Sequence, residues 1–352
     1  MAITKIGIIG LGGIANGKHI AELVKIKEAQ ITAICDINEE KLKTVGDKLD
    51  IDSAHRFVDY HDLIACPDVE AVEICTPNYL HVPMAIEAVE AGKFVNVEKP
   101  LAMSVSEAEM LQSVLDEHKA EAMICFSNRF RSTFRYARHL IEQGAIGKVL
   151  TLNIAYLKDS GLRPGRKLEW RFIKEYAGTG VLGDLAVHLI DMAQFLVGDI
   201  KAVCSQMGVI VDKRPKEDGS GMGNAETDDF CSFLAEMDND VHAVFDISRC
   251  VIGQTNGIHF IVCGDKGTLS CDVEDPDNIG IASRVIDADK PKMHNVPVPE
   301  EFFAGQEQCF VDFTQGKKQP FFPDINEGVR SQKILEAVEI SAKERRWVDI
   351  KA

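Results

Sequence analysis

The chain has 352 residues, of which 45% are hydrophobic and 27% charged, a composition typical of a folded globular protein of about two domains. Its 55 acidic residues against 39 basic ones give a net charge of −16, which argues against nucleic acid or an anionic membrane as a partner. No apolar run approaches the roughly 20 residues that a membrane-spanning helix needs.

The ten cysteines are scattered along the chain and include no C-x-x-C pair. Several fall in predicted strands, where a free thiol behaves as a small hydrophobic side chain. We therefore expect reduced cysteines, no metal site and a cytoplasmic protein. The first residues lead directly into a predicted strand, so we expect no secretory signal.

Residues 5–36 predict a strand–helix–strand unit. Residues 6–9 are a short apolar run, the glycine-rich stretch 10–15 follows, and apolar residues then recur at helical spacing. A second apolar run, 31–35, ends at Asp36.

The order of these parts matches what a bound dinucleotide requires. Gly10 permits a tight turn, Gly12 removes the Cβ that would block a pyrophosphate, and Ala15 allows close packing of helix on strand. The helix start, with Gly13 and Ile14, offers unpaired N–H groups to phosphates. Asp36 can accept hydrogen bonds from ribose hydroxyls. This stretch predicts a nucleotide-binding unit.

Strands and helices continue to alternate up to residue 126. Further strands are predicted around 53–57, 71–76, 93–97 and 122–126, and helices over 38–49, 80–91 and from Ser104 or Ser106 onward. This alternation predicts an α/β Rossmann domain, a doubly wound parallel sheet, over residues 1–126.

The pattern then changes, and we place a second domain over residues 127–352. Helices are predicted over 132–143, 180–196, 302–314 and 329–341, and strands with a period of two follow one another without intervening helices. This pattern predicts an α+β domain with an open, mostly antiparallel sheet and helices on one face. We expect the other face, with Val203, Val209, Phe233, Phe245 and Phe260, to be partly apolar and to form a homotetramer.

Polar residues follow three strands of the first domain, where ligands bind in such sheets. They are the glycine loop, Thr76-Pro77-Asn78 with His81, and Glu98-Lys99-Pro100. Lys99, held by Pro100, has two interpretations. It is either a functional group that transfers a proton or polarises a carbonyl, or an ordinary solvent-facing lysine.

In the second domain Asp184, His188 and Asp191 stand at helical spacing i, i+4 and i+7 in an otherwise apolar segment. Either Asp184 orients the His188 imidazole, or it is an N-terminal cap beside a core histidine. A basic group lies nearby and either binds phosphate or an oxygen-rich substrate, or is a solvated loop. It comprises Arg163, Arg166, Lys167, Arg171 and Lys174.

These motifs, taken in order, resemble the glucose–fructose oxidoreductase/inositol dehydrogenase (Gfo/Idh/MocA) family, and bacterial inositol dehydrogenases in particular. The motifs are Gly10-x-Gly12-x-x-Ala15, Thr76-Pro77-Asn78-x-x-His81, Glu98-Lys99-Pro100, Trp170-Arg171 and Asp184-x-x-x-His188-x-x-Asp191. The resemblance implies a Rossmann domain, a second domain that serves oligomerisation, and NAD-dependent oxidation of a sugar or polyol hydroxyl. It also implies that Lys99, Asp184 and His188 are catalytic, that residues 76–81 and Glu98 line the cofactor, and that Trp170 and Arg171 approach its nicotinamide end.

Three functions remain open on the sequence. The first is an NAD-dependent dehydrogenase acting on a cyclic polyol or sugar, in which either His188 or Lys99 accepts the proton. The second is a glycosidase that uses bound NAD for a transient oxidation. The third is an NAD-binding regulator without chemistry, against which the Lys99, Asp184 and His188 set argues because a binder needs no base.

Overall fold

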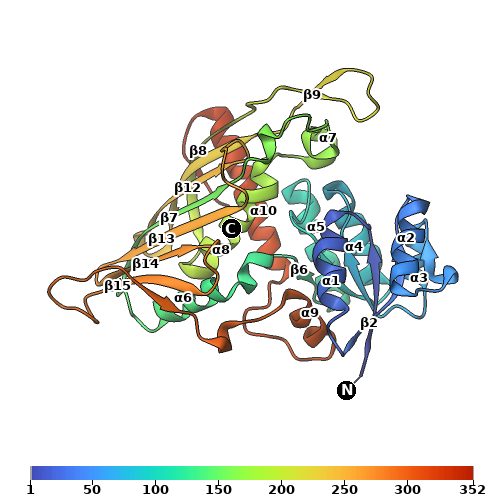
Figure 1. Ribbon diagram of the computed structural model, residues 1–352, viewed down its shortest axis with the longest axis horizontal. Helices are drawn as coiled ribbons and strands as arrows, with labels where there is room; N and C mark the ends of the chain where they lie inside the picture. Colours follow the sequence, from blue (N-terminus) through green and yellow to red (C-terminus); the bar gives the residue numbers. More distant parts are fainter. Residues whose placement is uncertain (1, 352) are drawn as a thin grey trace. The chain divides into compact units, whose positions relative to one another are not determined.

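The computed structural model describes residues 2–351, which form two compact units (Figure 1). The first unit comprises Met1–Phe126 and Ala304–Arg330, and the second comprises Ser127–Phe303 and Ser331–Ala352. Within the described residues no helix is both long and apolar enough to cross a membrane.

The first unit is built on a six-stranded sheet in the order β3-β2-β1-β4-β5-β6, in which every pairing is parallel. Its strands are β1 (Thr4–Ile9), β2 (Ala29–Cys35), β3 (Arg56–Phe57), β4 (Ala71–Ile74), β5 (Phe94–Val97) and β6 (Met123–Ile124). The strand order reverses between β1 and β4, whose carboxyl ends therefore flank the position where ligands bind in such sheets. The predicted Rossmann architecture is confirmed.

Helices connect these strands, as the alternating pattern predicted. They are α1 (Ile20–Leu23), α2 (Glu39–Leu49), α3 (Tyr60–Ala65), α4 (His81–Glu90) and α5 (Val105–His118). A π-helical turn, Ala15–His19, precedes α1. The side chains of Asn38 and Ser104 cap α2 and α5 by accepting hydrogen bonds from the N–H groups of Lys41 and Glu107.

The structure places Ala304–Arg330 in the first unit, whereas the sequence analysis expected it in the second domain. Helix α9 (Gln306–Thr314) lies in this segment. Its Thr314 shares a 2.7 Å hydrogen bond with Thr4, and its Phe313 ring packs edge-on against Phe94 at 5.5 Å. These contacts join positions more than 200 residues apart in the sequence, so no local pattern predicts them.

The second unit contains a nine-stranded sheet in the order β16-β15-β14-β13-β7-β12-β11-β8-β17. All of its pairings are antiparallel except that of β12 with β7. The strands are β7 (Val149–Leu157), β8 (Ile200–Gly208), β11 (Phe230–Met237), β12 (His242–Ser248), β13 (Gly257–Gly264), β14 (Gly267–Asp272), β15 (Asn278–Ser283), β16 (His294–Pro297) and β17 (Val348–Asp349). The open, mostly antiparallel sheet expected from the sequence is confirmed.

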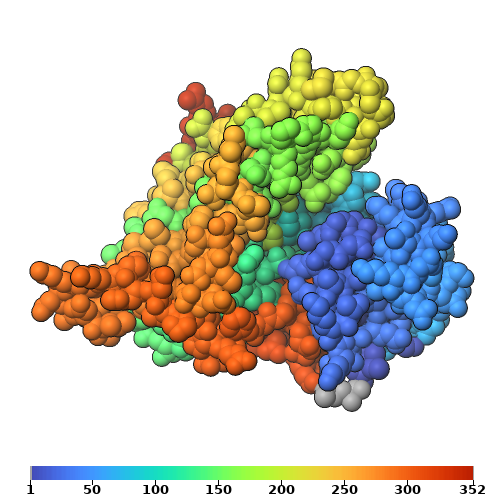
Figure 2. Space-filling model, in the orientation of Figure 1, coloured from blue at the N-terminus to red at the C-terminus, as the bar shows by residue number. Residues whose placement is uncertain are grey.

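Two surface features of the second unit were not predicted. A hairpin of β9 (Lys213–Pro215) and β10 (Met222–Asn224) follows β8. The exposed residues 284–290 follow β15 and lie in the orange projection at the left of Figure 2.

The helices α6 (Ser132–Glu142) and α8 (Val187–Leu196) and most of α10 (Ile325–Glu344) belong to this unit. They bury one face of the sheet, as in the packing of Phe134 of α6 against Phe260 at 5.2 Å. Val203, Phe233, Phe245 and Phe260 all lie on this buried face, so their assignment to an open apolar face was wrong. Alternation showed that these residues share a face, but only packing decides which face helices cover.

The uncovered face carries a different apolar set. Its members are 43–48% exposed and come from β11, β12 and β13: Leu234, Val244 and Ile261. Leu234 and Val244 are cross-strand neighbours. We call these three residues the open-face apolar set.

Candidate cofactor and active-site residues

The glycine loop after β1 leaves room for a ligand. Gly10 has a φ of +90°, and a Cβ there would lie 2.7 Å from the carbonyl oxygen of Cys75, so only glycine fits. A Cβ on Gly12 or Gly13 would meet no atom within 4 Å. The helical segment that follows begins at Gly13, and Ile14, before its π-helical turn, makes no side-chain cap hydrogen bond. Open space beside uncapped N–H groups suits a pyrophosphate.

Asp36 lies at the end of β2 and is only 9% exposed. One carboxylate oxygen accepts a 2.8 Å hydrogen bond from the N–H of Leu11, and the other accepts a 2.9 Å bond from the N–H of Asn38. The Nζ of Lys41 lies 3.5 Å from the first oxygen. Asp36 therefore also holds the glycine loop in place, a role that the sequence did not reveal.

The residues after β4 form a second loop, in which Asn78 is buried and a short helical turn precedes α4. The buried ring of His81 lies between two carbonyl oxygens, that of Pro100 at 2.8 Å and that of Thr76 at 2.9 Å. Burial lowers the pKa of His81 below its ordinary value. His81 thus links the Thr76-Pro77-Asn78 loop to the Glu98-Lys99-Pro100 loop. Both of its ring nitrogens lie within hydrogen-bond distance of backbone carbonyl oxygens.

Glu98 and Lys99 follow β5. Glu98 is 7% exposed, and one of its oxygens lies 3.0 Å from Nε2 of His19. The other oxygen accepts a 3.1 Å hydrogen bond from the backbone N–H of Lys99. Lys99 itself is half-buried. Its main chain is therefore fixed while its side chain reaches partly into solvent.

His19 is the centre of a buried acidic cluster that sequence reasoning missed. Its Nδ1 lies 3.1 Å from an oxygen of Glu73 and 3.1 Å from an oxygen of Glu307, and all three side chains are fully buried. The signal available in the sequence was a glutamate inside the apolar strand 71–74. The contribution of Glu307 from α9 had no such signal.

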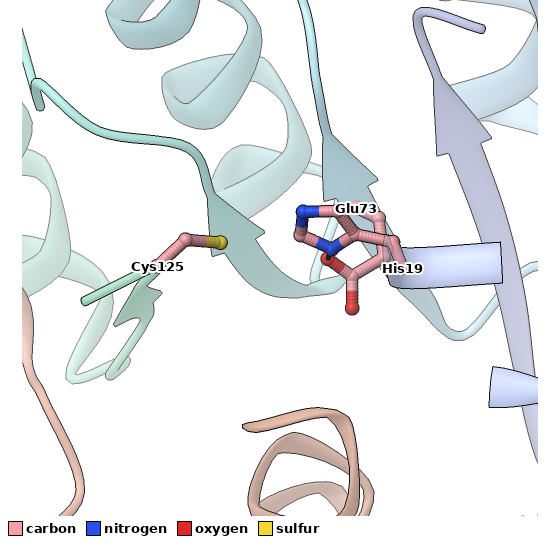
Figure 3. Close-up of side chains that lie close together, drawn as sticks. All are labelled: His19, Glu73 and Cys125. Carbon is pink, nitrogen blue, oxygen red and sulfur yellow. Dashed lines mark hydrogen bonds and ion pairs between the residues drawn. The ribbon is translucent and has the colours of Figure 1, made fainter. Parts of the chain in front are cut away.

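Part of this cluster resembles a metal site, because potential ligand atoms of His19, Glu73 and Cys125 lie within 4.8 Å of one another (Figure 3). Each already has a protein partner. The thiol of Cys125 donates to Oδ1 of Asn96 at 3.2 Å, and Asn96 Nδ2 donates to Glu73 at 2.8 Å. Burial raises the pKa of Cys125 well above its ordinary value, so the thiol keeps its proton. We assign no metal to these residues.

In the second unit, Asp184 and His188 do not lie on one regular α-helix as the spacing predicted. Asp184 belongs to a π-helical turn, Leu182–Ala186, and His188 follows it in α8. A π-helical turn bonds residues five apart, so the 100° spacing fails across it, and such turns are frequent at functional sites. His188 is 8% exposed and its ring centre lies 6.5 Å from that of Tyr156.

Asp191, the third member of the predicted stripe, has a different role. It forms a buried ion pair with Arg129, whose Nε lies 3.3 Å from one carboxylate oxygen. Asp191 is therefore the counter-charge of a buried arginine. Because Asp191 and Arg129 are buried together, each charge is compensated by the other.

Trp170 and Arg171 lie in a short helical turn, Trp170–Phe172, with the Arg171 guanidinium 4.5 Å above the Trp170 ring. Other members of the predicted basic group have local partners: Arg163 lies 3.5 Å from Asp159, and Lys174 lies 3.7 Å from Glu339.

Comparison with known proteins agrees with this geometry. Residues 4–126 match the oxidoreductase family with an NAD-binding Rossmann fold, and residues 134–270 match the GFO/IDH/MocA C-terminal domain. The chain belongs to the Gfo/Idh/MocA family. It is an NAD-dependent oxidoreductase, and the fit of Gly10, Gly12, Gly13 and Asp36 to a dinucleotide agrees with that cofactor.

Similar proteins include the levoglucosan dehydrogenase of Pseudarthrobacter phenanthrenivorans, 30% identical over 325 residues that cover 83% of each chain. The myo-inositol 2-dehydrogenase of Thermotoga maritima is 29% identical over 272 residues, which cover 76% of this chain and 75% of that protein. A solved structure of a levoglucosan dehydrogenase in complex with NADH and levoglucosan has a TM-score of 0.89 and 27% identity over 99% of this chain and 100% of that one.

Proposed function

We propose that this protein oxidises a secondary hydroxyl of a cyclic polyol or sugar, of the inositol type, to a ketone with NAD as hydride acceptor. The relatives named for levoglucosan and myo-inositol support this substrate class, because both compounds are rings that carry several secondary hydroxyls. The observation that carries the proposal is the position of Lys99, an ammonium at a strand end of the NAD-binding unit whose main chain Glu98 fixes.

NAD, when bound, supplies the acceptor for the hydride that leaves the substrate carbon. The protein must remove the hydroxyl proton from the same centre, and a side chain with a pKa near the working pH does this best. We assign proton acceptance to His188. Asp184 orients the imidazole and stabilises its protonated form. Lys99 stabilises the negative charge that develops on the substrate oxygen.

We propose a set of cofactor-binding residues, most of which lie at the strand ends of the first unit. The proposed residues are Gly10, Gly12, Gly13, Ile14, Asp36, Thr76, Pro77, Asn78, His81, Glu98, Lys99, Trp170 and Arg171. For His81 the support is indirect, since its ring holds two loops together through backbone carbonyls.

The test is a substrate screen with NAD. Inositol isomers, levoglucosan and common aldoses are incubated with the protein, and absorbance of the reduced nicotinamide is followed. Accumulation of NADH with one of these rings supports the dehydrogenase. Cleavage of a glycoside without NADH accumulation would indicate the glycosidase, and NAD binding without turnover of either class would indicate the regulator.

We also propose that the protein is a cytoplasmic homotetramer. All ten cysteines are unbridged, as expected in a reducing compartment. The open-face apolar set, Leu234, Val244 and Ile261, lies on an uncovered sheet face that a second copy of the chain can bury.

A further inference from the structure

The buried acidic cluster of the first unit combines side chains from four places in the sequence. His19 ends the π-helical turn after the glycine loop, Glu73 lies in β4, Glu98 follows β5 and Glu307 lies in α9. Both ring nitrogens of His19 face carboxylates, with Nδ1 3.1 Å from Glu73 and from Glu307, and Nε2 3.0 Å from Glu98. The imidazole therefore has an acidic partner on each side.

Burial and neighbouring charges shift the pKa values of the residues in this cluster. Burial disfavours the imidazolium, but the acidic neighbours Cys75 and Glu307 outweigh burial and raise the pKa of His19 well above its ordinary value. Burial and the charge of Glu307 raise the pKa of Glu73 well above its ordinary value. Burial opposes ionisation of Glu98, but the hydrogen bond and charge of His19, with the charges of Lys99 and Lys18, hold its pKa at about 2.

The cluster reaches Lys99 through the two oxygens of Glu98. Oε1 faces the His19 ring at 3.0 Å, and Oε2 accepts the backbone N–H of Lys99 at 3.1 Å. A carboxylate held by an imidazolium has one orientation, so its second oxygen also has a fixed place. The connection runs from the end of the turn that follows the glycine loop to the main chain of Lys99.

We propose that His19 is a positioning residue, which acts through Glu98 to fix Lys99 for the reaction. The inference rests on the proposed function, because it takes Lys99 as the electrostatic partner of the reacting oxygen. It goes beyond that function in assigning a role to a buried residue that touches neither substrate nor the proposed reacting atoms.

Energetics support a positioning role over a purely stabilising one. Burying an ionic group is costly, and well-packed hydrophobic residues of similar volume often serve stability equally well or better. In some proteins buried ionic groups instead specify one arrangement of the chain. Here the specified arrangement is the orientation of Glu98, which fixes the main chain of Lys99.

The kinetic test compares His19→Gln and Glu98→Gln with wild type and with Cys125→Ala. Gln at position 19 can still donate a hydrogen bond but carries no charge. We expect kcat to fall about tenfold or more in both variants. In His19→Gln, whose residue is not among the proposed cofactor contacts, NAD affinity should change less than about threefold. Cys125→Ala removes a buried thiol near the same cluster whose hydrogen bond goes to Asn96, and we expect it to retain wild-type kcat.

A double variant tests whether His19 acts through Lys99. In a Lys99→Met background, His19→Gln should reduce kcat by less than about twofold, because residues that act through one another are not additive. An equal fold-loss in both backgrounds would overturn the proposal, as would wild-type kcat in His19→Gln. If Lys99→Met itself turns over normally, the catalytic assignment of Lys99 fails instead.

A titration independent of activity completes the test. The ring nitrogen resonances of His19 are followed by NMR against pH in the full chain, with Glu98→Gln as the comparison. We expect the imidazolium to persist to higher pH in wild type than in Glu98→Gln, and identical titrations would overturn the proposed link. This titration can be measured even when no tested compound is a substrate. If Glu98→Gln fails to fold, Glu98→Asp, which retains the charge, replaces it as the comparison variant.

Discussion

Nε2 of His19 lies 3.0 Å from Oε1 of Glu98, and both side chains are buried in the first unit. This contact joins the helical turn after the glycine loop to the strand end that carries Lys99. The residues are 79 positions apart in sequence, and the contact exists because parallel strands bring their carboxyl ends to one edge of the sheet.

The first prediction concerns acid stability. Glu98 has a pKa of about 2 in the folded protein and near 4.3 in the unfolded chain. It therefore stabilises the fold fully above about pH 4.3, and this stabilisation is lost as the pH falls toward 2. His19→Gln removes the charge that lowers this pKa. The variant should therefore begin to unfold at higher pH than wild type in an acid titration followed by circular dichroism.

The raised pKa of His19 acts in the opposite pH range. The stabilisation that His19 contributes is complete below the pKa of an unfolded histidine, near 6.5. It is lost as the pH rises through the raised pKa of His19 in the folded protein. The stability gap between wild type and His19→Gln should therefore be largest between about pH 4.3 and 6.5. Urea titrations at several pH values measure this gap, and a gap that is constant with pH would contradict the charge assignment.

The second prediction concerns the choice of cofactor. Asp36 accepts hydrogen bonds from ribose hydroxyls but repels a 2′-phosphate, so kcat/KM should favour NAD over NADP by at least about tenfold, roughly 1.4 kcal/mol. Asp36→Ser should reduce this preference, since Lys41 lies 3.5 Å from the carboxylate and would then be available to a phosphate. Kinetics with both cofactors decide, and equal efficiency in wild type would contradict the assignment.

The third prediction concerns the catalytic groups. Lys99→Met and His188→Ala should each reduce kcat by about 10²–10⁴ while NAD affinity, measured by fluorescence titration, stays nearly unchanged. Neither side chain is proposed to grip the pyrophosphate. If both variants turn over at the wild-type rate the active site lies elsewhere, and if both lose NAD binding their catalytic assignment is wrong.

The fourth prediction concerns a buried ion cluster of the second unit. Asp229 lies 2.6 Å from Nε of Arg249 and 3.6 Å from Arg214, and its other oxygen accepts the N–H groups of Ile210 and Val211 at 2.8 Å. Asp229→Asn removes the carboxylate charge that lies between two buried guanidinium groups. We expect a loss of about 3–5 kcal/mol in the free energy of unfolding, measured by chemical denaturation.

Asp246→Asn is the matched control for this measurement. Asp246 lies on β12, is exposed and accepts a 2.9 Å hydrogen bond from Ser232. Its replacement should cost less than about 0.5 kcal/mol. Similar losses for both aspartates would show that burial of the ion cluster does not matter.

The fifth prediction concerns assembly. Light scattering at micromolar concentration should give the mass of a tetramer, and Leu234→Lys in the open-face apolar set should reduce it. A lysine there places a charge in an interface core that is depleted of charged residues. Met110→Lys on α5, an apolar residue 56% exposed in the first unit, should leave the mass unchanged. A monomeric wild type would contradict the proposed assembly.

Local sequence determined most of the secondary structure. The runs before and after the glycine loop became β1 and β2, and Asn38 and Ser104 cap the helices that they were predicted to start. Glycine spacing and Asp36 also identified the nucleotide loop, because a tight turn and a close backbone approach restrict the residue type at each position.

Only the tertiary structure decided which side of the large sheet is covered and where Ala304–Arg330 belongs. Strand alternation fixes that Phe233 and Phe245 share a face, whereas helices packed from elsewhere in the chain decide that the face is buried. The same holds for the buried acidic cluster. His19, Glu73, Glu98 and Glu307 carry no shared local pattern, and their charges become interdependent only when folding removes water and brings them within hydrogen-bond distance.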